Sequence, residues 1–247
     1  MNTRKYVYAF EEGDGKNKIL LGGKGAGLCE MTQIGLNVPP GFTATTEACL
    51  AYLDTNRLPD GLMEEIKVHM AALEKKTGKE FGGSKNPLLI SVRSGSAMSM
   101  PGMMDTILNL GLNEASLQGL IKQTANPRFA YDAYRRFIQL FGKIALGIDD
   151  EHFDDKMAAL KRKYDARLDL DLGTEQLKEL AGEFLEIVKR HTGKPFPQDP
   201  YEQLEISVGA VFRSWMGKRA VDYRKQFKIT KDMANGTAVS VCTMVFG

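Results

Sequence analysis

A long central block of the chain repeats its apolar residues with the period of an α-helix, between two regions with strand-like patterns. After Asn113, and as far as about Lys228, every segment has this helical period. Short apolar runs separated by glycine turns precede the block, and the β-branched segment Thr237–Phe246 follows it. This order predicts an α+β protein in which a helical part is inserted into a sheet-forming unit.

The segments before the block favour strands that alternate with helices. We expect strands at Tyr6–Phe10 and at the end of the proline turn Val38–Phe42. The glycines of Leu20–Met31 should lead into a short helix, and another helix should span Gly61–Lys76. With the returning strand near the end of the chain, these elements predict a mixed sheet with helices.

Two helices of the central block have recognisable starts. Asn126 precedes Pro127 and Asp199 precedes Pro200, so each pair joins a capping side chain to a proline at the first helical position. Aromatic and aliphatic residues then recur at helical spacing. Because such stripes form the core of helical proteins, we expect an all-helical subdomain here, without a ligand site on those stripes.

The bulk composition excludes several classes of protein. The chain has 247 residues, is 43% hydrophobic and carries a net charge of +2, so it has no global electrostatic reason to bind nucleic acid or a membrane. It lacks a run of about 18 apolar residues, and MNTRKYVYAFEEGDG is not a secretion signal. Its three cysteines, Cys29, Cys49 and Cys242, are far apart, so we expect a cytoplasmic protein with reduced thiols.

Neither metal ligands nor a histidine-based catalytic group is predicted. The acidic run Asp149–Asp155 lacks the ligand spacing of a calcium loop and is typical of a helix start. The histidines, His69, His152 and His191, belong to no local triad signature, so we expect structural or solvated roles for them.

A basic cluster lies near the end of the helical block. It is expected to form a solvent-exposed helix face, with the docking of another domain or chain as the alternative. Its members are Lys218, Arg219, Arg224 and Lys225.

Arg93 is the first candidate for binding chemistry. It follows the apolar run Leu88–Val92, and an arginine at the end of a buried strand is costly unless it meets an anion. Its planar guanidinium can bind two phosphate oxygens, although an ion pair with a neighbouring carboxylate is an alternative. The loop Ser94–Thr106 combines hydroxyls, glycines and methionines, as a lid that closes on a ligand would need.

That loop also permits a purely structural interpretation. Met103 and Met104 fit the core as well as they fit a lid, and Asp105 can either orient a ligand or stabilise a turn. The residues alone leave both interpretations open.

Lys24 is the second candidate for binding phosphate. It lies in GGKGAG, residues 22–27, where glycines allow the backbone to approach phosphates and the lysine adds a positive charge. The pattern is not that of the common P-loop. An ordinary turn with a solvated lysine is therefore an equal alternative.

Three stretches together strongly resemble the N-terminal part of the pyruvate phosphate dikinase family. They are LLGGKGAGLCEM (20–31), VPPGFTATTEAC (38–49) and PLLISVRSGSAMSMPGMMDTILNLGLN (87–113). The resemblance covers essentially the whole chain. The related phosphoenolpyruvate synthases are less similar through SMPGMMDTILNLGL (99–112), which favours the dikinases.

The resemblance implies the first lobe of an ATP-grasp nucleotide-binding domain. The lobe would comprise residues 1–112 and 198–247, with a helical insertion at 113–197. Lys24 and Arg93 would act on the nucleotide phosphates, and the covering loop would contribute Gly102, Met103, Asp105 and Thr106. The second lobe, with the carboxylates that hold magnesium, would follow the last strand, so the chain's end at Gly247 resembles a cut and no metal ligands are expected within it.

The family's full-length enzyme converts ATP, pyruvate and phosphate to AMP, phosphoenolpyruvate and pyrophosphate, with magnesium. The resemblance implies partners for this chain in a swivelling phosphohistidine domain, a (β/α)8 barrel and a second subunit of a homodimer. No TxSH-type motif surrounds any histidine here, so we expect the chain alone to bind ATP weakly and to lack turnover. A fragment of a phosphoenolpyruvate synthase-like dikinase and a stand-alone interaction module are the alternatives.

Overall fold

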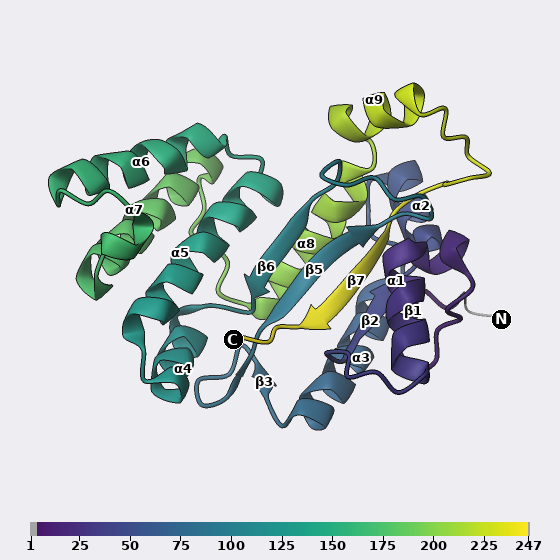
Figure 1. The fold of residues 1–247 in the computed structure, drawn as a ribbon, viewed down its shortest axis with the longest axis horizontal. Coiled ribbons are helices and arrows are strands. Elements are labelled where there is room, and N and C mark those ends of the chain that lie inside the picture. Colours follow the sequence, from purple (N-terminus) through teal and green to yellow (C-terminus); the bar gives the residue numbers. More distant parts are fainter. Residues whose placement is uncertain (1–3, 247) are drawn as a thin grey trace. The chain divides into compact units, whose positions relative to one another are not determined.

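The structure is a computed structural model that describes residues 4–246. Its packing divides the chain into two compact units (Figure 1). The first contains residues up to 78, residues 90–106 and residues from 205 onward, and the second contains residues 79–89 and 107–204. Residues 79–89 and 107–112 thus pack with the helical block. The limits of the first ATP-grasp lobe, residues 1–112 and 198–247, stay a prediction from the family resemblance.

The first unit is built on antiparallel strands. In spatial order these are β1 (Val7–Ala9), β2 (Gly41–Ala44), β7 (Ala238–Thr243) and β5 (Ile90–Gly95) (Figure 1). Each neighbouring pair is antiparallel. The strands predicted near both ends of the chain are therefore confirmed, and the last strand lies between two strands from the first half of the sequence.

The first unit also contains helices. They are α1 (Lys18–Gln33), α2 (Thr46–Thr55), α3 (Leu62–Thr77), the larger part of α8 (Pro200–Ser214) and α9 (Lys218–Gln226). Of these, α1, α2 and α3 pack on the strands. The predicted helix at 61–76 is confirmed as α3, which begins after Gly61 in a left-handed conformation. Thr45 caps α2, because its side chain accepts a hydrogen bond from the backbone N–H of Ala48.

The glycine segment differs from the sequence-based expectation, because its glycines lie within α1 and not before it. α1 is broken at Gly22, where φ is 68° and ψ is 162°. A Cβ atom at Gly22 would come within 2.1 Å of the Gly95 carbonyl oxygen, and one at Gly25 within 2.8 Å of Thr43 Oγ1. The glycines therefore let the backbone of α1 lie directly on the sheet.

Strand alternation assigns the two faces of the sheet different roles. Arg93 on β5 pairs with Ser240 on β7, which pairs with Thr43 on β2, so the three share one face. Gly25 of α1 lies over Thr43 and Ser240 on this face. The adjacent residues Val92, Val241 and Phe42 point to the opposite face and are buried. Arg93 is thus on the side of the sheet that α1 covers.

The second unit is mainly helical, as predicted. It contains the parallel pair β3 (Glu80–Phe81) and β4 (Pro87–Leu88), nearly all of β6 (Thr106–Leu110), α4 (Glu114–Thr124), α5 (Pro127–Ile144), α6 (Asp150–Lys163), a 3₁₀ turn (Asp169–Asp171) and α7 (Thr174–Thr192). Phe137, Phe141 and Phe196 pack edge to face at centroid distances of 5.3–5.6 Å. The protein is α+β, with antiparallel and parallel pairs.

Within the described residues, no helix is long and apolar enough to cross a membrane.

Candidate functional site

A cavity of about 880 Å³ lies in the first unit, between the start of α1 and the loop that follows β5. It is lined by Lys18, Gly23, Lys24, residues 94–102, Met104 and Thr106. These described lining residues include two lysines, three serines and a threonine but no carboxylate. Their chemistry fits an anionic ligand with several oxygen atoms.

Lys24 lies at the wall of this cavity, in the helical part of α1 after the break. Its Nζ donates a hydrogen bond of 3.0 Å to the carbonyl oxygen of Ser94. Burial lowers the pKa of Lys24, and the nearby positive charge of Arg93 lowers it further. Two cations held this close favour an anion between or beside them.

Arg93 itself is exposed on β5 and does not line the cavity. Among the residues that the structure describes, none forms a hydrogen bond or an ion pair with its guanidinium. Its charge nonetheless acts on Lys24 and on the thiol of Cys242. The structure thus brings the charge of Arg93 close enough to act on Lys24. Among residues 4–246, no carboxylate forms the ion pair with Arg93 that was the alternative interpretation.

The loop after β5 is fixed at its base and turns back on itself at its tip. The backbone N–H of Gly23 donates to the Ser96 carbonyl at 2.8 Å, and that of Met103 donates to the Met100 carbonyl at 3.2 Å. Met100 is buried, whereas Met98 and Ser99 are exposed. The tip therefore has one apolar anchor and a solvent-facing side.

The predicted loop residues separate into two groups. Gly102 and Thr106 line the cavity, whereas Met103 and Asp105 do not. The Asp105 carboxylate instead lies 3.2 Å from Nη2 of Arg219 on α9. In the sequence Arg219 belongs only to a basic cluster, and no local pattern links it to this loop, because Asp105 and Arg219 are 114 residues apart.

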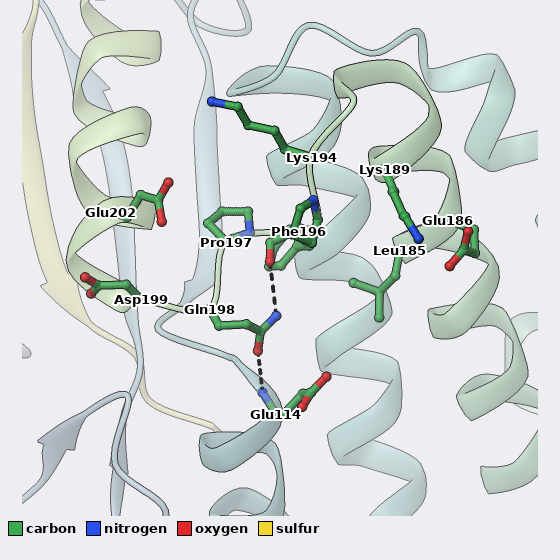
Figure 2. A pocket seen from close by; sticks show the side chains of 11 residues that line it. Glu114, Leu185, Glu186, Lys189, Lys194, Phe196, Pro197, Gln198, Asp199 and Glu202 are labelled. Carbon is green, nitrogen blue, oxygen red and sulfur yellow. Dashed lines mark hydrogen bonds between the residues drawn. The ribbon is translucent and has the colours of Figure 1, made fainter.

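A second cavity, of about 800 Å³, lies within the helical unit (Figure 2). Four carboxylates and two lysines provide its charged lining: Glu114, Glu186, Asp199, Glu202, Lys189 and Lys194. The Gln198 side chain accepts from the backbone N–H of Glu114 at 3.0 Å and donates to the Phe196 carbonyl at 3.3 Å. The acidic excess opposes a polyphosphate, so the cavity beside Lys24 is the nucleotide-site candidate.

A protein-bound magnesium ion needs oxygen ligands, among them carboxylates. Within residues 4–246, no group of three or more histidine, cysteine, aspartate or glutamate side chains could hold a metal ion. The cavity beside Lys24 also has no carboxylate among its lining residues. The described residues therefore do not fit a protein-bound magnesium site.

An α+β unit that presents cationic side chains and a glycine-containing loop to one cavity is typical of the class of domains that bind phosphate groups. The chain matches the family "Pyruvate phosphate dikinase, AMP/ATP-binding domain" over residues 18–67 and 55–247, and it belongs to that family. It therefore corresponds to the N-terminal ATP-binding part of pyruvate phosphate dikinases.

Similar curated proteins include pyruvate, phosphate dikinases from three distant organisms. That of Entamoeba histolytica is 61% identical over 98% of this chain and 27% of its own length. That of Clostridium symbiosum is 48% identical over 98% of the chain and 28% of its own length, and a chloroplastic rice protein is 48% identical over 99% and 26%. The chain spans about a quarter of the length of these relatives.

Proposed function

We propose that the cavity beside Lys24 binds the phosphates of ATP, and that the first unit is the first lobe of an ATP-grasp fold. The observation that carries this proposal is the charge of the cavity, which has two lysines and no carboxylate among its described lining residues. Arg93 adds a third cation within electrostatic range of Lys24. Phosphoryl transfer depends on this kind of positioning and charge neutralisation.

In this proposal Lys24 and Arg93 bind phosphate oxygens. Lys24 offers a compact point charge, whereas Arg93 offers two parallel N–H donors to a phosphate. Gly102 supplies a backbone N–H group and Thr106 a hydroxyl, because both residues line the cavity. Met103, whose own N–H donates to the Met100 carbonyl, takes part through the conformation of the loop. Asp105 takes part in the same way.

The activity of the full-length protein follows from the family. We propose that it transfers phosphoryl groups from ATP to a histidine and on to pyruvate, and that it forms phosphoenolpyruvate, AMP and pyrophosphate. The identities of 45–61% to pyruvate, phosphate dikinases favour this reaction over that of a synthase. Magnesium, the swivelling phosphohistidine domain and the barrel belong in this proposal to the remainder of a homodimeric enzyme.

A cytoplasmic location is part of the same proposal. The three cysteines are unpaired, and Cys29 and Cys49 are buried, as expected in a reducing compartment. The rice relative is named as chloroplastic, and that location is the alternative.

Titration of the 247-residue chain with a non-hydrolysable ATP analogue, followed by NMR, tests the binding site. We expect weak, submillimolar or poorer affinity, with amide shifts concentrated at Gly23, Lys24 and residues 94–106. Shifts confined to the acidic cavity of the second unit would contradict the proposed site. Micromolar affinity would contradict the assignment of essential nucleotide contacts to the remainder of the enzyme.

A further inference from the structure

Arg219 connects α9 to the tip of the loop that lines the cation-rich cavity. Its Nη1 donates to the carbonyl oxygen of Gly102 at 3.3 Å, and its Nη2 lies 3.2 Å from Asp105 Oδ1. We propose that Arg219 is a positioning residue, which holds this loop over the cavity through its ion pair with Asp105 and its hydrogen bond to the Gly102 carbonyl. This inference rests on the proposed nucleotide site only for its effect on ligand affinity.

The position of Arg219 in its helix supports a role outside the helix. Lys218 and Arg219 occupy the first turn of α9, where the positive end of the helix dipole disfavours cations. Lys218 is compensated by Asp222, at 2.9 Å and one turn along the helix. Arg219 is compensated instead by the carboxylate and carbonyl of the loop.

The base from which Arg219 reaches the loop is firmly held. Ala220 is fully buried, and the Arg224 guanidinium lies 3.8 Å from the centre of the Trp215 ring. Arg224 Nη1 also donates to the Trp215 carbonyl at 2.8 Å. Because these contacts hold α9 just C-terminal to Arg219, the backbone of Arg219 is a stable base from which its side chain reaches the more weakly held loop.

The loop has few other polar anchors at its tip. Among the described residues, both hydrogen bonds that reach residues 97–105 from outside 94–106 come from Arg219. The remaining ones join loop residues to each other, such as Met103 N–H to the Met100 carbonyl. Losing Arg219 would therefore leave the tip held mainly by its buried Met100 side chain.

The contact between Arg219 and Asp105 also offsets the negative charge of the loop. Asp105 is the carboxylate of the loop, and a free carboxylate beside polyphosphate would repel it. Arg219 neutralises Asp105 at a place outside the cavity lining. The Arg219 side chain is 66% exposed and that of Asp105 29%, so the pair is weak and can open and reclose.

Hydrogen exchange of the 247-residue chain tests the role of Arg219 without any ligand. Arg219→Ala should accelerate exchange in residues 97–105 by about two- to five-fold, the range expected for an exposed ion pair. Arg219→Lys keeps the charge but loses the two-pronged contact, so it should restore only part of the protection. Asp105→Asn should resemble Arg219→Ala, and combining the two changes should add little.

Lys218→Ala is the matched control, because it removes a cation from the same helical turn without touching the loop. Equal exchange in Lys218→Ala and Arg219→Ala, or no change in Arg219→Ala, would overturn the inference. In the ATP-analogue titration, Arg219→Ala should weaken binding by a similar factor while Lys218→Ala should not. If the unaltered chain binds no analogue, the proposed function fails, whereas the exchange result still decides the role of Arg219.

Discussion

Gly22→Ala is the most informative single change in the chain, because Gly22 joins the break in α1 to the end of β5. Its φ of 68° and ψ of 162° lie in a region that only glycine adopts readily. A Cβ there would lie 2.1 Å from the Gly95 carbonyl oxygen and 2.6 Å from its carbon. The atoms that it would strike are backbone atoms, which cannot rotate away as a flexible side chain can.

The expected loss of stability has two causes, the strained backbone conformation and the clash with Gly95. Holding alanine in this conformation costs about 1–3 kcal/mol, and forcing a methyl group into a packed site costs about 1–3 kcal/mol more. The free energy of unfolding should therefore fall by about 2–6 kcal/mol, a large part of the total for a typical domain. The displacement would also reach the cavity, since Ser94 and Gly95 contact Lys24.

Urea unfolding provides the assay, because the single tryptophan of the chain, Trp215, is 5% exposed within the first unit and its fluorescence reports on that unit. Gly27→Ala is the matched control. Gly27 lies in the same helix, and a Cβ there would meet nothing within 4 Å, so alanine should stabilise by about 0.5–1 kcal/mol. A Gly22→Ala variant as stable as the Gly27→Ala variant would refute the reasoning.

Three further outcomes are expected. In the full-length enzyme, Arg93→Ala should raise the barrier to single-turnover phosphorylation from ATP by about 2–4 kcal/mol, and an unchanged rate would exclude the proposed role. Burial would raise the pKa of Glu12, but hydrogen bonds from Lys5, a backbone N–H and His69 outweigh it and lower the pKa from 4.5 to about 2. Its stabilisation is present above pH 4.5 and lost as the pH falls toward 2, so Glu12→Gln should flatten the acid-unfolding profile in that window. Burial raises the pKa of Cys49 to about 12, so mass spectrometry should find it alkylated by iodoacetamide at pH 8 far more slowly in the folded chain than in urea.

Local patterns in the sequence were sufficient for most of the elements. Helical periodicity identified the central block, and β-branched composition identified β7 (Ala238–Thr243), because both signals arise from residues close together in the chain. The glycine segment was harder to interpret. Its glycines are required by contacts of Gly22 with Gly95 and of Gly25 with Thr43, and no window around residue 22 contains that information.

In the candidate site, too, local patterns indicated single residues but not the contacts between distant ones. Lys24 and Arg93 were identified because a charged residue among glycines or at a strand end is locally unusual, and the structure brings their charges within range of each other. The contact between Asp105 and Arg219 joins the loop to a helix far along the chain. Each residue has an ordinary local explanation, so only the folded arrangement reveals the pair.

Charge placement, and not cavity size, distinguishes the two cavities. Their volumes of about 880 and 800 Å³ are nearly equal, and the net charge of +2 favours neither of them. Among its described lining residues, the cavity beside Lys24 has two lysines and no carboxylate. The cavity of the helical unit has four carboxylates and two lysines. Asp105 would weaken that contrast if it faced the first cavity, since a carboxylate there would offset one lysine. In our proposal, the ion pair between Asp105 and Arg219 therefore both positions the loop and keeps the cavity cationic, so one contact serves the geometry and the electrostatics of the proposed phosphate site.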